Sequence, residues 1–345
     1  MLFSVLNWGL GHACRSIPII DALIERNINI TIASDGLALS YLQDRFPKCN
    51  FLELPSLDIS YTDRGSQTLA VSKSIVKNST WYMSEREVIK RFLNTYKTHG
   101  IITDNRPTAH HPEIHSVYMT HQLKVRAGFL TPIASLGHAN FYKRYHEIWV
   151  PDIDDIRNLS GDLSRTSCNR VVKFIGPLSD LNPSDCTEKY KLGIILSGPE
   201  PQRTILENEL TDQLGNSRQN VWLVRGTDQP LVKDAPAGWK ITDVANRDTI
   251  QDVYSNCMTL ISRNGYTTLM DLYSNPKPAV LIPTPGQPEQ QYLASLRIHQ
   301  DNFAHANQDD LHMSKSITEA IEKSKNQKVI VFDRNWDKLF RPFLG

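Results

Sequence analysis

Short apolar runs alternate with helix-period segments along the first half of the chain. The segments Ala13–Arg26 and Leu37–Arg45 carry apolar residues at helical spacing, and residues 66–98 are expected to hold one or two longer helices. The strand-like runs are Leu2–Asn7, Ile28–Ala33, Phe51–Leu54, Ile101–Thr103, Val117–Met119 and, as the last of this half, Glu147–Val150. Strands that alternate with helices predict a parallel sheet covered on both faces.

A second alternation follows a segment without periodicity. Residues Gly176–Lys189 are rich in Pro, Ser, Asp and Asn, which is typical of a linker. The later strand-like runs are Lys191–Leu196, Val221–Val224, Met258–Ile261, Ala279–Ile282 and Val329–Phe332. The pattern predicts an α/β protein with two Rossmann-like, doubly wound domains and an interdomain cleft. The expected boundaries are 1–178 for the first domain, 179–189 for the linker, 190–333 for the second domain and 334–345 for an amphipathic helix that packs back on the first domain.

Composition narrows the class of protein. With 345 residues, two domains are the natural expectation, and the net charge of +1 gives no electrostatic basis for binding nucleic acid. The five cysteines include no Cys-x-x-Cys pair, so neither a zinc site nor a disulfide framework is expected. We expect no signal peptide, because the first apolar run is short and no basic segment precedes it, and no apolar run approaches the length of a membrane span. A cytoplasmic protein is expected.

The segment Ser262–Gln291 has the arrangement that a nucleotide-sugar needs. A strand end leads into the turn Arg263-Asn264-Gly265 and then a helix, whose first N–H groups attract a diphosphate. Asp271, further along that helix, can accept both hydroxyls of a ribose. Side chains on the following Pro/Gly loop can bind the hydroxyls of a hexose, and these are Gln287, Glu289, Gln290 and Gln291. The alternative is an ordinary strand–helix–strand unit with polar loops.

A second loop of the same domain also points to phosphate. Ser197 and Gly198 follow a strand and can present a hydroxyl and N–H groups, while Arg203 can add a charge-assisted contact. The alternative is a proline-rich turn that caps a helix. Both loops follow strands of one sheet, so two phosphate-directed loops are a stronger signal than either alone.

The loop Asn7–Arg15 carries the candidate base. Gly9 and Gly11 allow a close approach of the backbone to a ligand, and His12 titrates in a range that suits general base catalysis. Asp104 or Asn105, at the end of another strand of the sheet, is expected to reach the imidazole, and we take Asp104 as the residue that orients it. A histidine that caps its own helix is the alternative, and Arg15 is expected to face either a ligand or solvent.

Two further motifs point to other kinds of site, a dinucleotide site and a metal site, and both signals are weaker than those of the loops above. Gly9-x-Gly11 with Asp35 at the end of the second strand partly fits a dinucleotide fingerprint, but Cys14 occupies the third glycine position. The run Asp152-Ile-Asp154-Asp155 has the spacing of a metal-binding Asp-x-Asp signature. We interpret it as a solvated acidic turn, and we expect no metal.

Taken together, the motifs resemble those of GT-B glycosyltransferases, in particular glycosyltransferase family 28 with its lipid-linked N-acetylglucosaminyltransferases. SRNGYTTLMDL and PTPGQPEQQYLAS stand where that family has its donor-binding helix and sugar-binding glutamines, and GLGHACR stands at its first glycine loop. The layout with TDNR, MTHQ, IWVPD and LSGPEPQRT resembles still more closely a group of uncharacterised bacterial glycosyltransferase-like proteins.

The resemblance implies roles for both domains. It implies that the first domain binds the acceptor and that Gly11 and His12 face the reaction. In the second domain, Asp271 would hold the donor ribose, Gln290 and Gln291 the donor sugar, and Gly265 with Ser197 the diphosphate. The chain departs from the family at Gly198-Pro199-Glu200-Pro201, which replaces a glycine-rich loop, and at Asp271, where glutamate is usual.

The expected function is therefore a metal-independent, inverting glycosyl transfer. A hexose or N-acetylhexosamine would move from a nucleoside-diphosphate sugar, in the first place a UDP-sugar, to the hydroxyl of a lipid-linked, saccharide or small-molecule acceptor. No cofactor is expected beyond this co-substrate. The alternatives are a nucleotide-sugar 2-epimerase or hydrolase of the same fold and a non-catalytic nucleotide-sugar-binding protein. Segment Leu69–Met83 mixes lysines with apolar residues, which fits either peripheral membrane contact or a core-facing helix.

Overall fold

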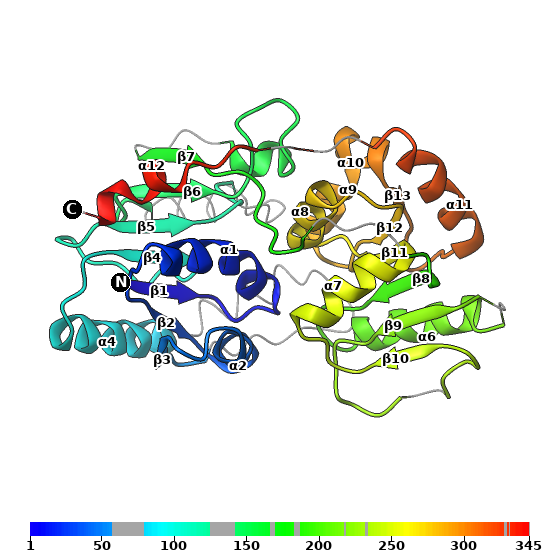
Figure 1. The fold of residues 1–345 in the computed structure, drawn as a ribbon, viewed down its shortest axis with the longest axis horizontal. Coiled ribbons are helices and arrows are strands. Elements are labelled where there is room, and N and C mark those ends of the chain that lie inside the picture. Colours follow the sequence, from blue (N-terminus) through cyan, green and yellow to red (C-terminus); the bar gives the residue numbers. More distant parts are fainter. Residues whose placement is uncertain are drawn as a thin grey trace. The chain divides into compact units, whose positions relative to one another are not determined.

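The chain folds into two compact α/β units (Figure 1). The computed structural model describes residues 1–56, 79–124, 142–165, 170–182, 187–216, 219–231, 234–327, 330 and 332–344. Among these, unit 1 comprises the residues up to Asp180 together with those from Phe332 onward, and unit 2 comprises the residues from Leu181 to Ile330.

Unit 1 is built on a parallel sheet. Over the described residues its strand order is β3-β2-β1-β4-β5-β6-β7. The strands are β1 Leu2–Val5, β2 Thr31–Ser34, β3 Asn50–Glu53, β4 Ile101–Asp104, β5 Ser116–Met119, β6 Glu147–Val150 and β7 Val171–Phe174. The helices are α1 Gly11–Glu25, α2 Gly36–Arg45, α4 Ser79–Thr95, η2 Gly161–Ser164, α12 Trp336–Phe340 and η3 Arg341–Phe343.

The connections of unit 1 fix where a ligand can bind. β1 pairs with β2 on one side and with β4 on the other, so the chain leaves β1 in one direction and later returns to its other edge. Such a point, at the carboxyl ends of the strands, is where open α/β sheets bind ligands. It lies between the loop after β1, which leads into α1, and the loop after β4.

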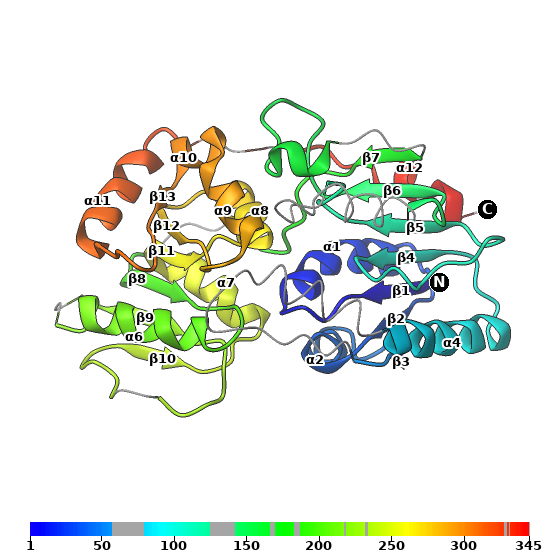
Figure 2. The same ribbon diagram turned by 180° about the vertical axis from the view of Figure 1, so that it is seen from behind.

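The C-terminal segment packs on unit 1, beside β6 and β7 in Figures 1 and 2. Phe340 is fully buried, and its ring centroid lies 6.2 Å from that of Trp149 on β6. Phe343 lies 6.1 Å from the same indole. Arg26 at the end of α1 donates to Asp337 at 2.7 Å. The amphipathic pattern of the segment therefore covers apolar surface of the first domain, where the sequence predicted it.

Unit 2 repeats the doubly wound arrangement. Its described residues give a parallel sheet in the order β10-β9-β8-β11-β12-β13, with the corresponding reversal between β8 and β11. The strands are β8 Tyr190–Ile195, β9 Val221–Val224, β10 Lys240–Thr242, β11 Cys257–Arg263, β12 Ala279–Ile282 and β13 Ala304–His305. The helices are α6 Gln202–Leu214, α7 Arg247–Asn256, α8 Tyr266–Ser274, α9 Pro288–Ser295, α10 Arg297–Asn302 and α11 Met313–Ser324.

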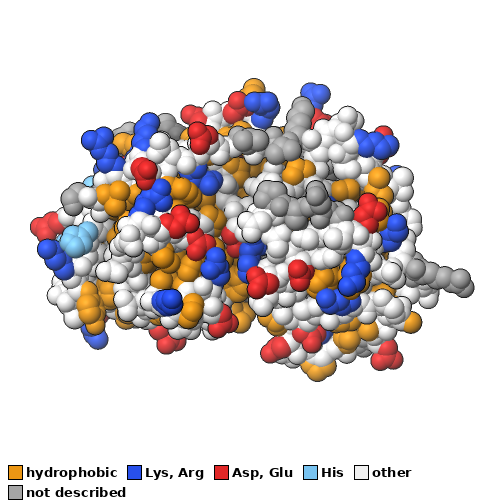
Figure 3. Space-filling model, viewed as in Figure 1, with side chains coloured by type: hydrophobic (Ala, Val, Ile, Leu, Met, Phe, Trp, Pro, Cys, Tyr) orange, Lys and Arg blue, Asp and Glu red, His pale blue; other side chains and the backbone are white. Residues whose placement is uncertain are grey.

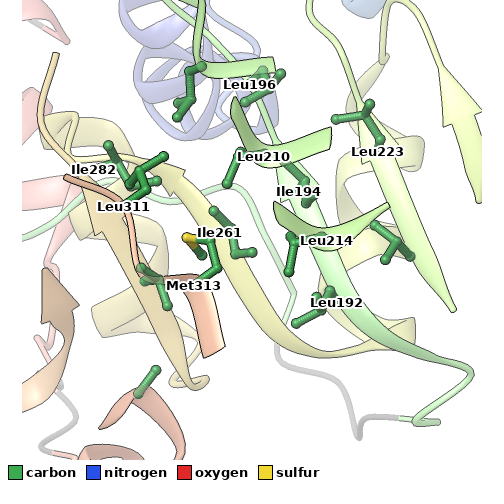
Figure 4. Packing of buried hydrophobic residues seen from close by; sticks show 14 of the residues in the cluster. Leu192, Ile194, Leu196, Leu210, Leu214, Leu223, Ile261, Ile282, Leu311 and Met313 are labelled. Carbon is green, nitrogen blue, oxygen red and sulfur yellow. The ribbon is translucent and has the colours of Figure 1, made fainter. Parts of the chain in front are cut away.

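Helices cover both faces of this sheet. α7 lies in front of the sheet in Figure 1 and α6 in front of it in Figure 2. Figure 4 shows the core beneath α6, where side chains of that helix and of α11 meet those of the strands. The buried residues labelled there are Leu192, Ile194, Leu196, Leu210, Leu214, Leu223, Ile261, Ile282, Leu311 and Met313. The packed sheet leaves its strand ends as a rigid support for polar loops.

Some expected elements differ from the structure. β7 extends the first sheet beyond Glu147–Val150, the run taken as its last strand, and β10 and β13 were not predicted because they are short and lack an apolar alternation. The run Val329–Phe332 was expected to be a strand. Residues 328, 329 and 331 lie outside the described residues, and Ile330 and Phe332 are not in a strand.

The surface carries charges of both signs. On the face drawn in Figure 3, acidic and basic side chains lie interspersed over both units, in keeping with a net charge of +1. Within the described ranges, none of the helices combines the length and the apolar character needed to cross a bilayer.

Candidate active site

His12 and Asp104 meet at the carboxyl end of the first sheet. Asp104 is the last residue of β4 and is the register partner of Val5, the last residue of β1. The chain leaves β1 and enters α1 at Gly11, so His12 lies in the first turn of a helix that begins beside Asp104. His12 Nδ1 lies 3.0 Å from Asp104 Oδ1. The structure thus has the contact that the sequence predicted.

Arg15 is a third member of this cluster, and its burial contradicts the alternative that it faces solvent. Its side chain is only 2% exposed, and its Nε donates to Asp104 Oδ2 at 2.6 Å. Its Nη2 donates to Asp104 Oδ1 and also lies 2.9 Å from His12 Nδ1. His12 and Arg15 are three residues apart on a helix, so their side chains share one face, and the carboxylate of β4 lies beneath that face.

His121, which follows β5, completes the cluster. Its Nδ1 lies 3.0 Å from Arg15 Nη1. A guanidinium can only donate hydrogen bonds, so this Nδ1 is the acceptor and the ring proton of His121 is on Nε2. The structure thus places His121 in contact with the arginine that binds Asp104.

Burial and charge set the protonation of the cluster. Burial, the largest cause, lowers the pKa of His12 below its usual 6.5, Asp104 opposes this shift, and Arg15 and His121 reinforce it. Burial alone would raise the pKa of Asp104, but the charges and hydrogen bonds of Arg15 and His12 outweigh it and hold that pKa well below the usual range. At neutral pH the cluster therefore holds an ionised carboxylate, a guanidinium and a neutral His12 imidazole, which has a lone pair to offer to a proton.

Asp35 is not available for a ribose, which removes the main support for a dinucleotide site. Its Oδ1 accepts from Arg106 Nη1 at 2.6 Å, and its Oδ2 accepts from Asn7 Nδ2 at 3.2 Å. Arg106 is fully buried and also donates to Glu85 Oε2 at 2.9 Å. The acidic residue at the end of β2 therefore holds the loops after β1 and β4 in place.

In unit 2 two glycines leave open space at the strand ends. Gly198, after β8, has φ +104, and a Cβ built on it would meet only Thr284 Oγ1, at 3.9 Å. Gly265 is the N-cap of α8, no side chain caps this helix, and a Cβ there would meet only Thr268 Oγ1, at 3.7 Å. Ser197 beside Gly198 is exposed. The two loops predicted to bind phosphate thus offer backbone groups beside open space.

Arg263, the last residue of β11, is a buried cation without a counter-ion among the described residues. Its Nη2 donates to the carbonyl of Gln202 at 2.6 Å, whereas its Nε and Nη1 are buried and lack hydrogen-bond partners there. Burial lowers the pKa of Arg263 to about 10. The Asn264 Oδ1, Thr284 Oγ1 and Gln308 Oε1 atoms are also buried and unpartnered in this part of the chain. A charged donor in such a place favours a bound anion or water.

Arg203, by contrast, is already neutralised. It is 3% exposed, its Nε donates to Glu200 Oε1 at 2.5 Å, and its Nη1 donates to Glu207 Oε2 at 2.7 Å. Burial alone would raise the pKa of Glu200, but hydrogen bonds from Thr204 and Arg203 outweigh it and lower that pKa. Glu200, an awkward neighbour for a diphosphate, is thus paired with Arg203. Through these contacts Arg203 supports the loop between β8 and α6.

Hydrogen bonds within the predicted sugar-binding loop hold it in place. Gln290 Oε1 accepts from the Thr284 N–H at 2.8 Å, and Gln290 Nε2 donates to Gln287 Oε1 at 2.6 Å. Asn264 Nδ2 donates to the Gln290 carbonyl at 2.8 Å, which ties the loop to the end of β11. Glu289 is half-buried and Gln291 is exposed. These contacts occupy the Gln290 amide, so Gln291 is the glutamine whose side chain extends into solvent.

Asp271 lies on α8 beyond its first turn and is half-buried, and Gly11 is half-buried at the start of α1. Asp271 acts on the buried Tyr254. Burial is the largest cause that raises the pKa of the Tyr254 phenol, and the negative charge of Asp271 raises it further. Asp271 lies on the helix that begins after Gly265, and its role in binding a ribose stays a prediction.

The acidic run after β6 has a structural use. Asp152 is fully buried and not solvated as expected, because its Oδ1 accepts from the Leu159 N–H at 2.9 Å and its Oδ2 from the Ser160 N–H at 2.8 Å. Asp154 is exposed. Over the described ranges, no group of three or more His, Cys, Asp and Glu side chains has a metal-binding arrangement. Of the segment Leu69–Met83, residues 69–78 lie outside the described residues.

Comparison with known proteins gives the site its context. Residues 202–331 match the glycosyltransferase family 28 C-terminal domain. No curated protein matches the sequence. MurG of Acinetobacter baumannii is similar in structure, with a TM-score of 0.56 and 15% identity over 95% of each chain.

Two further solved structures are also similar to this chain. The glycotransferase of kitacinnamycin has a TM-score of 0.63 at 12% identity, over 95% of this chain and 93% of its own. A UDP-glucosyltransferase from Polygonum tinctorium has a TM-score of 0.61 at 14% identity, over 100% and 98%. At these identities the likeness shows the fold, which is GT-B, as the sequence predicted.

Proposed function

We propose that this chain, a glycosyltransferase of the GT-B fold whose second unit carries a family 28 C-terminal domain, transfers a sugar with inversion and without a metal. The donor in this proposal is a nucleoside-diphosphate hexose or N-acetylhexosamine, in the first place a UDP-sugar. The acceptor is a hydroxyl. Unit 2 binds the donor, and unit 1 supplies the base.

The observation that carries the donor site is the unbalanced charge of Arg263. A buried guanidinium with two unpartnered nitrogens is costly, because burial removes its hydration and no carboxylate among the described residues replaces it. A diphosphate at the adjacent strand ends supplies the missing negative charge. The low dielectric around a buried cation makes this attraction stronger than it would be at the surface.

The diphosphate itself is assigned to the backbone around Gly198 and Gly265. Both positions have open space where a side chain would be, and Gly265 begins a nine-residue helix without a side-chain cap. The N-terminus of a helix contributes about 0.3–1 kcal/mol to a nearby anion at an exposed site and up to about 2 kcal/mol when partly buried. The helix alone is therefore too weak to stabilise the leaving group, and Arg263 adds the charge.

The remaining donor contacts follow from the same unit. Asp271 accepts the ribose hydroxyls, and Gln291 and Glu289 bind hydroxyls of the sugar, while Gln287 and Gln290 keep their loop rigid through the contacts described above. The preference for uridine is supported by a structural neighbour that is itself a UDP-glucosyltransferase.

His12 acts as the base. Its Nδ1 lies near both Asp104 and Arg15, and we assign its proton to the hydrogen bond with the carboxylate, so the Nε2 lone pair is left to take the proton of the acceptor hydroxyl as that oxygen attacks the anomeric carbon. The bond from the anomeric carbon to the diphosphate oxygen breaks on the opposite side, so the configuration inverts. A positioned base of this kind contributes about 10²–10⁴-fold to the rate.

A ligand panel tests the donor site. The protein is heated with UDP, GDP, TDP, UDP-glucose, UDP-N-acetylglucosamine and NAD, and the same panel is applied to Asp271→Ala and to the exposed control Asp252→Ala. A ligand at 100 times its dissociation constant stabilises by about 2.7 kcal/mol. We expect the uridine series to stabilise the parent and the control but not Asp271→Ala. Stabilisation by NAD alone, or by none of the ligands, would contradict the proposal.

Product analysis separates transfer from its alternatives. A hydrolase or epimerase converts the donor with no acceptor present, and a non-catalytic binding protein leaves it intact under all conditions. We expect release of the nucleoside diphosphate to depend on an added acceptor and to be lost in His12→Gln, with donor binding retained.

A further inference from the structure

We propose that Arg15 is a positioning residue that keeps His12 uncharged by taking up the negative charge of Asp104. The inference deepens the proposed function, since His12 is the base assigned there. It assigns Arg15 neither to the donor nor to the acceptor. Its effect on the reaction passes through the carboxylate and the imidazole that it contacts.

The geometry makes Arg15 the main partner of Asp104. The guanidinium contacts both carboxylate oxygens, with Nε 2.6 Å from Oδ2 and Nη2 bound to Oδ1, whereas His12 reaches one oxygen at 3.0 Å. Arg15 is 2% exposed and Asp104 is fully buried, so water does not screen the pair. In a simple His–Asp pair the carboxylate stabilises the imidazolium. Here most of that stabilisation goes to the guanidinium, which is always charged.

Arg15 also contacts the imidazole directly. Its Nη2 lies 2.9 Å from the same His12 Nδ1 that lies 3.0 Å from Asp104. A protonated His12 would place a second positive charge beside this guanidinium, and the two charges repel each other. The guanidinium therefore opposes protonation in two ways, by its own charge and by withdrawing the charge of Asp104.

Side chains from the elements packed against this imidazole also act on it. Among the described residues they are Asp104 at the end of β4, Arg15 on α1 and His121 after β5. Burial, Arg15 and His121 lower the pKa of His12, and Asp104 alone raises it. Removing Arg15 therefore removes one of these opposing effects and leaves the whole charge of Asp104 to act on His12.

Arg15 thereby sets the pH range in which His12 can act as a base. With Arg15 in place, His12 is neutral and ready to accept a proton throughout the physiological range. Without Arg15, the buried carboxylate would hold a proton on His12, and the base would be blocked until the pH was raised.

The test is a titration of His12 in the free protein, which requires no turnover. The imidazole signal is followed by NMR in the parent and in Arg15→Met, with His12→Gln to assign the signal. Arg45→Met is the matched control, because Arg45 forms an ion pair with Asp21 on an exposed surface. We expect the pKa of His12 to rise by about one unit or more in Arg15→Met and to be unchanged in Arg45→Met. The Arg15→Lys variant, which restores the charge, should return the pKa towards the parent value.

A second variant, Asp104→Asn, should shift the pKa of His12 in the opposite direction. It leaves Arg15 beside His12 without the carboxylate, so the pKa of His12 should fall further. This comparison remains decisive where Arg15→Met does not fold. A His12 titration that is the same in the parent and in these variants overturns the inference.

Kinetics then separate positioning from a merely structural role. In Arg15→Met the acid limb of the kcat/KM profile should move to higher pH by the same amount as the titration, with activity recovered at high pH. A uniform loss at every pH would show that Arg15 acts only on the fold. If no donor sugar is turned over by any variant, the proposed function fails, while the titration still decides the role of Arg15.

Discussion

Arg106 donates to Asp35 at 2.6 Å with both side chains buried, and this ion pair joins the loop after β4 to the end of β2. Arg106 also pairs with Glu85, so removal of Asp35 breaks one of two ion pairs in a buried network, which costs about 1–3 kcal/mol. We therefore expect Asp35→Ala to lower the free energy of unfolding by that amount, measured by denaturation in urea.

Asp21→Ala is the control for this prediction. Asp21 pairs with Arg45 at the surface, where such a pair is worth about 0–1 kcal/mol. A loss in Asp35→Ala no larger than that in Asp21→Ala would show that the buried pair does not stabilise unit 1.

Arg263 and Arg106 are both buried, but their partners differ, and so should the effects of replacing them. Arg106 binds two carboxylates, whereas Arg263 binds one carbonyl and leaves two nitrogens unpartnered among the described residues. Arg263→Met removes an uncompensated charge together with a single hydrogen bond, so it should destabilise the free protein by less than Arg106→Met does. Thermal unfolding of both variants without ligand measures this difference.

The same Arg263→Met variant should fail in catalysis. The charge of the leaving diphosphate grows in the transition state, so turnover should fall at least about tenfold and by more than donor affinity does. Arg297→Met on the exposed face of α10 is the control. Equal losses in kcat and in donor affinity would contradict a role for Arg263 in stabilising the leaving group.

The sequence was sufficient to predict the fold because its signals are local. Buried strands such as Val221–Val224 and Ala279–Ile282 are apolar throughout, and their alternation with helices implies a parallel sheet. The contact between His12 and Asp104 was predictable for the same reason, since both follow strands that end at one edge. The edge strands β7 and β13 were missed because β13 has only two residues and β7 is short and only partly buried, so neither stands out from the neighbouring loops.

The state of the charged side chains was only partly predictable. Arg15, Arg203 and Arg263 all follow strands and all resembled ligand-binding cations. The partner of Arg15 is Asp104, which is distant in sequence, so that pairing is a property of the packed structure. Arg203 pairs with Glu207 four residues on in the same helix, a spacing that the sequence does show. The buried Arg263 has no carboxylate partner among the described residues, and only the packed structure reveals this.

Gly198 and Gly265 offer a matched test of the diphosphate site. Both have room for a Cβ, but Gly198 has φ +104 and Gly265 has φ −79. An L-residue at Gly198 is strained by about 1–3 kcal/mol, whereas one at Gly265 is not. Gly198→Ala should therefore lower the free energy of unfolding, and Gly265→Ala should leave it nearly unchanged.

Both alanine variants should weaken donor binding, because each methyl group occupies space assigned to the diphosphate. Isothermal titration with the nucleoside diphosphate measures this effect separately from stability. Normal affinity in Gly265→Ala would remove the N-terminus of α8 from the proposed site.

His305 on β13 should make the stability of the protein depend on pH. Burial is the largest cause that lowers the pKa of His305, to about 4, and Lys323 adds to the shift. The unfolded chain, with a pKa of about 6.5, binds more protons than the folded protein between these two values. The free energy of unfolding is therefore at its full value above pH 6.5 and falls as the pH drops towards 4, where the loss from this group reaches about 3 kcal/mol.

Replacement of His305 by leucine removes the titrating group, so His305→Leu should flatten the decline between pH 6.5 and 4. The exposed His312 is the control, and His312→Leu should decline as the parent does. Parallel curves for the parent and His305→Leu would show that this buried imidazole is not the source of the dependence.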